Sequence, residues 1–206
     1  MTTPFSAEDF QAATNVSRET LERLGHYGAM LEKWQKAINL VGKSTIPDLW
    51  RRHMLDSFQV LGQTEKTTGT WLDLGSGAGF PALVVAICSD FDVHAVESDQ
   101  RKCLFMQNVS RETLAGLTAH NLRIEALPPM TADIISARAL APLDKLLDYA
   151  APFSTPETEF LFLKGQDVDE ELTNASKCWN MQIEAHSSVT SPDGHLLKLT
   201  KVSRLS

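Results

Sequence analysis

The sequence predicts an α/β protein: a mostly parallel, doubly wound sheet with terminal antiparallel strands and an N-terminal helical cap. Three observations predict this fold class. Strand-like and helix-like stretches alternate from residue 70 to residue 178, and a glycine-rich turn, Gly75 to Gly79, follows the first strand-like stretch. The last two strand-like stretches flank Pro192-Asp193-Gly194. Alternation of this kind is typical of parallel sheets, and a flanked turn is typical of an antiparallel pair.

The N-terminal third is predicted to be helical. Ser6 and Asp9 have the spacing of a capping box, which opens a short helix. From Ser17 to Ile38 apolar residues recur every three or four positions, which predicts an amphipathic helix of about six turns. After a break, residues 48–61 predict another helix, and the polar stretch 63–69 is a candidate hinge. We therefore expect a helical cap at residues 1–66 and one compact core at residues 67–206.

The core elements follow in chain order. Strands are predicted at residues 71–74, 93–96, 122–125, 133–137 and 159–163, and helices at 82–88, 99–117, 143–150 and 167–178. Two loosely alternating stretches, 181–189 and 195–202, predict the terminal antiparallel pair. A chain of 206 residues suits one domain of ordinary core size.

Charge and composition limit the partners. The net charge of −7 argues against indiscriminate binding to polyanions. Residues 1–70 hold eight Lys or Arg and eight Asp or Glu, so any nucleic-acid surface is local, and Arg51-Arg52-His53 is the densest cationic spot there. Three distant cysteines and no paired histidines predict neither a disulfide nor a metal site. Residues 1–5 show no leader and no apolar run could span a bilayer, so we expect a cytoplasmic protein without a membrane partner.

The glycine spacing selects among nucleotide ligands. A dinucleotide fingerprint needs G-x-G-x-x-G, but position 80 is Phe80 and the third glycine is Gly79. No G-K-[ST] follows, which excludes a phosphate-binding P-loop. The turn Asp73-x-Gly75-x-Gly77-x-Gly79 suits S-adenosyl-L-methionine (AdoMet), with Asp73 facing its ammonium group. Glu97, which ends the next strand, is placed to accept hydrogen bonds from ribose hydroxyls.

Several short islands around this turn resemble one family. They are Trp34 with Asn39-Leu40, Arg52-His53 with Leu55-Asp56-Ser57, Trp71 to Pro81, Glu97-Ser98 with Arg101-Lys102, Arg123-x-Glu125, Arg138-Ala139 and Lys164-Gly165. Together they resemble the small-subunit ribosomal RNA methyltransferase G family, also called glucose-inhibited division protein B. The resemblance implies a Rossmann-like, class I AdoMet-dependent methyltransferase that methylates N7 of a guanosine in 16S rRNA.

The resemblance also implies roles for single residues. Gly75 and Phe80 would line the cofactor site, Ile124 and Glu125 would lie along the adenosine, and Arg138 would sit between cofactor and RNA. We expect contacts with the RNA substrate at His53, Lys102, Arg123 and Lys164. The alternative for each is a solvated or packing residue, and for His53 a pair with Asp56 that holds the cap to the core. Three positions, Gln35, Val41 and Ala82, depart from the usual family pattern.

The implied chemistry needs no general base. The lone pair of guanine N7 is free at neutral pH, so no proton leaves the nucleophile, and positioning supplies most of the catalysis. An Arg that donated to both O6 and N7 would occupy the reacting lone pair. We therefore assign no catalytic residue and name Arg138, Arg123 and Lys164, at the predicted strand ends, as positioning candidates that contact O6 or a phosphate.

Other functions remain open at this point. One alternative is an AdoMet-dependent methyltransferase for a small molecule or a protein, which the acidic charge favours. Another is a non-catalytic protein that senses AdoMet or binds the ribosome. An NAD-dependent oxidoreductase is disfavoured by Phe80 in place of the third glycine. We expect a monomer.

Overall fold

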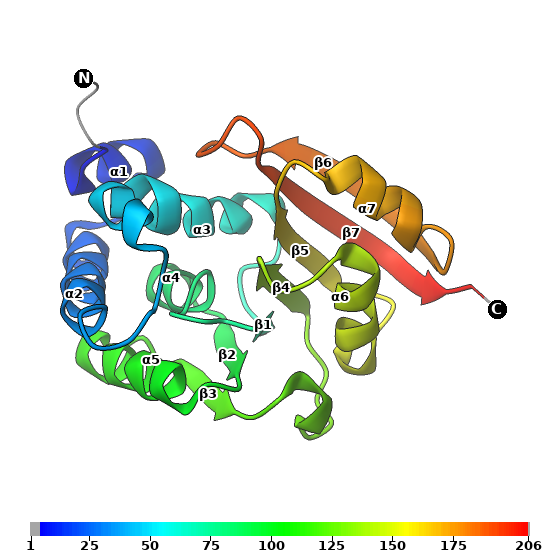
Figure 1. Cartoon of the computed structure of the whole chain (residues 1–206), viewed down its shortest axis with the longest axis horizontal. Helices are drawn as coiled ribbons and strands as arrows, with labels where there is room; N and C mark the ends of the chain where they lie inside the picture. The colour runs from blue at the N-terminus through cyan, green and yellow to red at the C-terminus, as the bar shows by residue number, and fades with distance from the viewer. Residues whose placement is uncertain (1–4, 206) are drawn as a thin grey trace.

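The computed structural model describes residues 5–205 and contains a seven-stranded sheet of order β3-β2-β1-β4-β5-β7-β6 (Figure 1). The strands are β1 (Thr70–Leu74), β2 (Asp92–Glu97), β3 (Thr118–Asn121), β4 (Ile134–Arg138), β5 (Glu159–Lys164), β6 (Trp179–Ser187) and β7 (His195–Arg204). The first five pair in parallel, whereas β7 runs antiparallel to both β5 and β6. The predicted mostly parallel sheet with a terminal antiparallel pair is confirmed.

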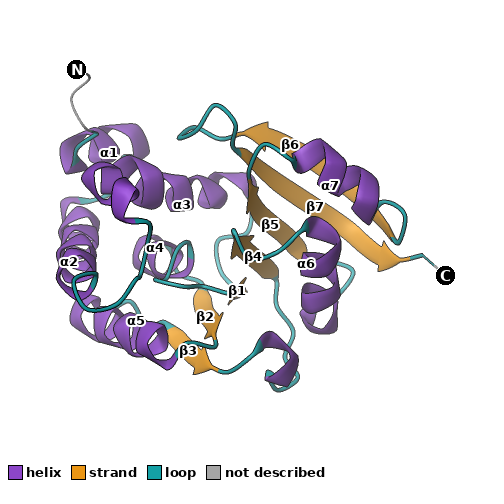
Figure 2. Cartoon of the chain, in the orientation of Figure 1, coloured by secondary structure: helices purple, strands orange, loops and turns teal. Residues whose placement is uncertain are grey.

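Helices cover both faces of this sheet (Figures 1 and 2). On one face lie α4 (Ala82–Cys88) and α5 (Gln100–Thr113), and on the other lie α6 (Leu143–Ala150), the short η5 (Ala151–Phe153) and α7 (Val168–Ala175). Side chains alternate across β1, so that Trp71 packs with the first set and Leu72 with the second. Each face of the sheet therefore has its own hydrophobic cluster.

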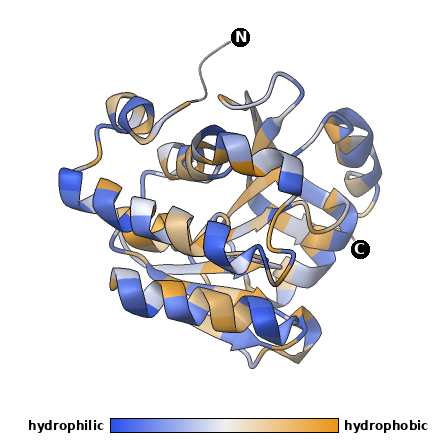
Figure 3. Cartoon of the chain, turned by 60° about the vertical axis from the view of Figure 1, so that its left-hand side comes forward, coloured by the Kyte–Doolittle hydropathy of each residue, from blue (hydrophilic) through white to orange (hydrophobic). Residues whose placement is uncertain are grey.

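The cap forms a further layer over α4 and α5. Ser6 and Asp9 cap α1 (Ala7–Thr14) reciprocally, as predicted. The amphipathic α2 (Arg18–Trp34) packs against α4 and α5, and Figure 3 shows its mixed hydrophobic and hydrophilic sides. This helix ends four residues before Ile38, because the buried Gln35 side chain bonds to the backbone of residues 40 and 41 and turns the chain.

The segment predicted as one helix over 48–61 is helical but irregular. It consists of η1 (Lys43–Asp48), the π-helical η2 (Trp50–Leu55), α3 (Asp56–Phe58) and η3 (Gln59–Gln63). Pro47 lies inside η1 and removes one backbone donor from it. Apolar periodicity shows which side is buried but not the hydrogen-bond register, so the sequence could not reveal the π turn.

The predicted third strand is wrong. The strand paired with β2 is β3, at Thr118–Asn121, and Ile124–Ala126 form the short 3₁₀ turn η4. The helix α5 ends at Thr113, four residues earlier than predicted, and its C-cap Leu114 has a left-handed conformation, so the next strand also begins earlier. Arg123 consequently lies in the loop after β3, and β3 is not a neighbour of β4.

Two other expectations concern the ends and divisions of the chain. Residues 1–4, where the sequence shows no leader, lie outside the described residues. Among residues 5–205, no helix is both long and apolar enough to cross a membrane. The boundary at residue 66 stays a prediction, and the cap shares one hydrophobic cluster with α4 and α5.

Candidate cofactor and substrate site

The candidate site lies where β1 and β4 end side by side. The chain leaves β1 toward β2 on one side of the sheet and returns through β4 on the other. Such a reversal of strand order opens a crevice at the carboxyl ends of the strands, where ligands bind in doubly wound sheets. The glycine turn follows β1 at this edge and Arg138 ends β4.

The glycine turn requires residues without side chains. Gly75, Gly77 and Gly79 have φ angles of 66°, 58° and 94°, which L side chains rarely adopt. A Cβ at Gly75 would lie 2.5 Å from the side chain of Leu140, whereas a Cβ at Gly77 would meet nothing nearer than a backbone oxygen at 4.0 Å. The Gly77 N–H donates to Glu97 Oε2 over 2.9 Å and fixes the turn to the end of β2. Gly77 therefore leaves open space at the ligand edge.

A cavity of about 440 Å³ opens at this turn, and we call it the first cavity. Nine predicted site residues line it: Gly75, Gly77, Phe80, Glu97, Lys102, Arg123, Ile124, Glu125 and Arg138. Asp73 and Gly79 do not line it. The sequence reasoning missed Leu40, Val41 and Tyr149, which also contribute to its wall. Gln35, which departs from the usual family pattern, could have pointed to Leu40 and Val41. Its buried side-chain amide hydrogen-bonds to the backbone of both residues.

Asp73 lies beneath the turn and is fully buried. Its Oδ1 accepts a 2.6 Å hydrogen bond from Ser136, whose hydroxyl accepts one from the Trp71 indole over 2.8 Å. Its Oδ2 has no partner among the described residues. Burial raises the pKa of Asp73 to about 6, although the Ser136 hydrogen bond lowers it. Asp73 thus places a carboxyl group beneath the turn, and the open space at Gly77 leaves room above it for a ligand with an ammonium group such as AdoMet.

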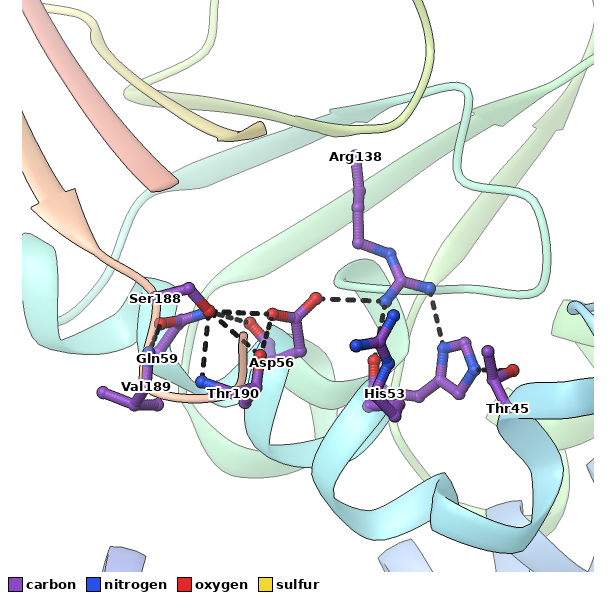
Figure 4. Close-up of polar contacts among 9 residues, drawn as sticks. Thr45, His53, Asp56, Gln59, Arg138, Ser188, Val189 and Thr190 are labelled. Carbon is purple, nitrogen blue, oxygen red and sulfur yellow. Dashed lines mark hydrogen bonds and ion pairs between the residues drawn. The ribbon is translucent and has the colours of Figure 1, made fainter. Parts of the chain in front are cut away.

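Arg138 joins the cap to the core (Figure 4). Its Nη2 donates to His53 Nδ1 over 3.0 Å, and its Nη1 lies 3.3 Å from Asp56 Oδ2. The predicted i,i+3 partners His53 and Asp56 therefore meet through Arg138. The guanidinium carbon lies 5.1 Å from the centroid of the Phe80 ring, in a cation–π contact. Three side chains, on η2, on α3 and in the glycine turn, thus fix the guanidinium.

His53 links Arg138 to Thr45 through hydrogen bonds at its two ring nitrogens. Its Nε2 lies 2.7 Å from Thr45 Oγ1, and that hydroxyl donates to Gly42 O over 2.7 Å. Since Nδ1 accepts from Arg138, Nε2 carries the proton and donates to Thr45. Burial, with the positive charges of Arg138 and Arg52, lowers the pKa of His53 to about 3. His53 is therefore uncharged and fully engaged at neutral pH.

Phe80, which replaces the third glycine of a dinucleotide turn, lies in an aromatic stack. Its ring centroid is 4.9 Å from that of Tyr27 and 4.9 Å from that of His53. The buried Tyr27 hydroxyl donates to Ala78 O over 2.8 Å, and so the cap also bonds to the backbone of the glycine turn. Phe80, which excludes the dinucleotide fingerprint, thus connects the glycine turn with the cap.

A second cavity, of about 830 Å³, adjoins the first. His53 and Lys164 line it, whereas Lys102 and Arg123 lie on the first cavity only. The Lys164 ammonium forms an ion pair with Glu171 and donates to Ala141 O over 2.9 Å. The sequence reasoning missed Thr190, whose hydroxyl donates to Asp56 Oδ1 over 2.6 Å, because 134 residues separate the two and no motif joins them.

The strand order and the glycine turn at its carboxyl edge define a class of protein, the Rossmann-like class I methyltransferase fold. A putative S-adenosyl-L-methionine-dependent methyltransferase from Methanococcus maripaludis has the same fold, with a TM-score of 0.59 at 12% identity over 100% of this chain and 97% of that one. A family model described as rRNA small subunit methyltransferase G matches residues 20–199. The chain belongs to this family.

Two relatives are similar over nearly their whole lengths. Both are named ribosomal RNA small subunit methyltransferase G. The protein from Parvibaculum lavamentivorans is 52% identical over 199 residues, which cover 94% of this chain and 88% of the relative. The protein from Rhodospirillum rubrum is 50% identical over 197 residues, which cover 96% and 98%.

Proposed function

We propose that the protein is an AdoMet-dependent methyltransferase that methylates N7 of a guanosine in the 16S rRNA of the small ribosomal subunit. The family match over residues 20–199 carries this proposal. The relatives' names specify small-subunit rRNA. The choice of guanosine N7 depends on the sequence resemblance.

The first cavity is the proposed cofactor site. Asp73 would supply an anionic partner for the ammonium group of AdoMet, and Glu97 would accept from the ribose hydroxyls. Ile124 and Glu125 would lie along the adenosine. When bound, AdoMet supplies an electrophilic methyl group on a sulfonium.

The chain's own contribution is positioning. Guanine N7 needs no deprotonation, and His53, the one buried histidine beside the site among the described residues, is neutral with both nitrogens engaged. Arg138 lines both cavities, and its contacts to the cap fix its guanidinium at the wall that the two cavities share. We propose that Arg138 orients the base through O6 or a phosphate and leaves N7 free. Arg123 and Lys102 would contact RNA at the rim of the first cavity.

We also propose that the protein acts in the cytoplasm as a monomer on RNA within the small subunit or an assembly intermediate. The acidic net charge of −7 supports recognition of a shaped ribosomal site over binding to RNA in general.

The proposal is tested by transfer of labelled methyl from AdoMet to small subunits from cells that lack this gene. We expect label in the 16S rRNA fraction, and none in subunits that are already methylated. Label in ribosomal proteins or in a small-molecule extract would favour a different methyltransferase. AdoMet binding without transfer to any of these would favour a sensing or ribosome-binding protein.

A further inference from the structure

The second cavity has the position of a substrate pocket. It lies between the carboxyl ends of β4 and β5, the cap segment around η2 and the turn that joins β6 to β7. It shares Arg138, Ala139 and Leu140 with the first cavity, so these residues form a common wall. Its volume of about 830 Å³ lies within the usual range of ligand sites.

The β6–β7 turn is fastened to the cap across this cavity (Figure 4). Thr190 Oγ1 donates to Asp56 Oδ1 over 2.6 Å, and Val189 N donates to Gln59 Oε1 over 3.1 Å. The other oxygen of Asp56 contacts Arg138. One carboxylate therefore connects the turn with the common wall, and two of the elements that border the cavity are bonded to each other.

Gly165 has no folding reason to be glycine. Its φ is outside the left-handed region, and a Cβ built on it would find no heavy atom within 4 Å. It lines the second cavity directly after β5. Because Gly165 lines the cavity, its missing side chain leaves space there for the close approach of a ligand. In the common wall, Ala139 has a φ of 51°, an uncommon conformation of the kind that clusters at functional sites.

The lining charges favour a base over a phosphate. The cavity is lined by three cations and four carboxylates: Arg52, Arg138 and Lys164, and Asp56, Asp167, Glu171 and Asp193. An excess of carboxylates repels a phosphate. A guanine presents both hydrogen-bond donors and acceptors on its edges, which suits a wall of mixed sign. Enzymes that modify a base turn it out of the stack into such a pocket and recognise its edges there.

We infer that the second cavity receives the target guanine, turned out of its RNA stack, with N7 directed across the common wall toward the first cavity. The inference rests on the proposed function. The open position at Gly165 admits the base, and the bond from Thr190 to Asp56 positions Arg138 beside it.

The direct test fills the cavity with Gly165→Leu and uses Gly62→Leu as the control. Gly62 is an exposed glycine on η3 that also has no atom within 4 Å of a built Cβ, and it lines neither cavity. The assay measures methyl transfer to unmethylated small subunits, AdoMet affinity by titration calorimetry, and the melting temperature. We expect Gly165→Leu to lower the transfer rate on the order of 100-fold, because the base is displaced, with AdoMet affinity and melting temperature unchanged. Gly62→Leu should match the wild type in all three.

A second pair of variants tests the turn without filling the cavity. Thr190→Val should lower the transfer rate on the order of 10-fold at unchanged AdoMet affinity, whereas Thr200→Val on the same hairpin should not. If Gly165→Leu does not fold, the comparison of Thr190→Val with Thr200→Val tests the inference. The inference would be overturned if Gly165→Leu, or Thr190→Val where Gly165→Leu does not fold, transferred methyl at the wild-type rate. A loss of AdoMet affinity in either variant would also overturn it. If the wild-type protein itself transfers no methyl, the proposed function fails.

Discussion

At the scale of single residues, the site depends on charged groups that the fold holds in unusual states. Asp73 is fully buried with one oxygen unpaired, and its pKa is raised to about 6. A folded-state pKa above the unfolded value stabilises the protein at low pH, and this contribution is lost as the pH rises through about 6. The protein therefore keeps a destabilising carboxylate beside the glycine turn, which is expected where a cation must bind.

The substitution Asp73→Asn should separate stability from binding. At pH 8 it removes a buried charge, so the free energy of unfolding should rise by about 3 kcal/mol, the equivalent of a pKa shift of roughly two units. The gain should shrink toward pH 4, where Asp73 in the wild type is protonated. AdoMet affinity should fall. Urea denaturation at pH 4, 6 and 8, with AdoMet titration, checks both effects. A variant that is less stable than wild type at pH 8 would contradict the assigned pKa.

Arg138 is the residue that joins the two cavities. The substitution Arg138→Ala removes the guanidinium that we propose positions the base, together with its contacts to His53 and Asp56. We expect the methylation rate to fall on the order of 100-fold, with a smaller change in melting temperature than for a core substitution. Single-turnover methylation of small subunits measures this. Unchanged activity would remove Arg138 from the site.

At the scale of elements, the irregular helical segment of the cap, η1 to η3, carries the residues that contact Arg138. The π-helical η2 ends beside α3, so that His53 and Asp56 both reach Arg138. The sequence predicted the βαβ unit well, because its glycine turn and alternating apolar strands report local geometry directly. It could not predict the contacts of Arg138 with the cap or of Asp56 with Thr190, because these depend on tertiary packing between distant segments. It misplaced β3 for a related reason: strand bounds follow from pairing with β2.

His53 should make the stability of the cap sensitive to acid. Burial lowers its folded-state pKa from the ordinary value of 6.5 to about 3, so its contribution to stability is complete above pH 6.5 and is lost as the pH falls toward 3. The variant His53→Gln keeps polar atoms there but does not titrate. We expect the difference in unfolding free energy between wild type and variant to decrease from pH 7.5 to pH 4.5. Parallel denaturation profiles over that range would contradict the neutral, buried state.

Arg23 on α2 connects the cap helix to the helices beneath it. Its guanidinium donates to Thr113 O over 2.7 Å, Leu114 O over 3.1 Å and Ile87 O over 3.3 Å, at the carboxyl ends of α5 and α4. Removing it leaves these carbonyls without that donor, so Arg23→Ala should cost about 2 kcal/mol of stability. Arg18→Ala on the same helix removes only an exposed ion pair with Glu22 and should cost less than about 0.5 kcal/mol. Equal effects in thermal melts would show that Arg23 does not connect the layers.

At the scale of the whole molecule, three layers meet at one edge of the sheet. The glycine turn borders the first cavity, the ends of β4 and β5 border the second, the cap contributes residues to both, and the β6–β7 turn contributes residues to the second. The fold itself is shared with methyltransferases at 12% identity, so it does not determine the substrate. The family match and the arrangement of the two cavities around Arg138 carry the functional account.

The most direct measurement maps the methyl group to an atom and a nucleotide. Small subunits from cells lacking the gene are incubated with the protein and labelled AdoMet, and the 16S rRNA is then cleaved by reduction and aniline at 7-methylguanosine. The account predicts label at a single guanosine and one new cleavage site, absent without the protein. Label that resists this cleavage, or that lies outside the 16S rRNA, would contradict N7 methylation of a small-subunit guanosine.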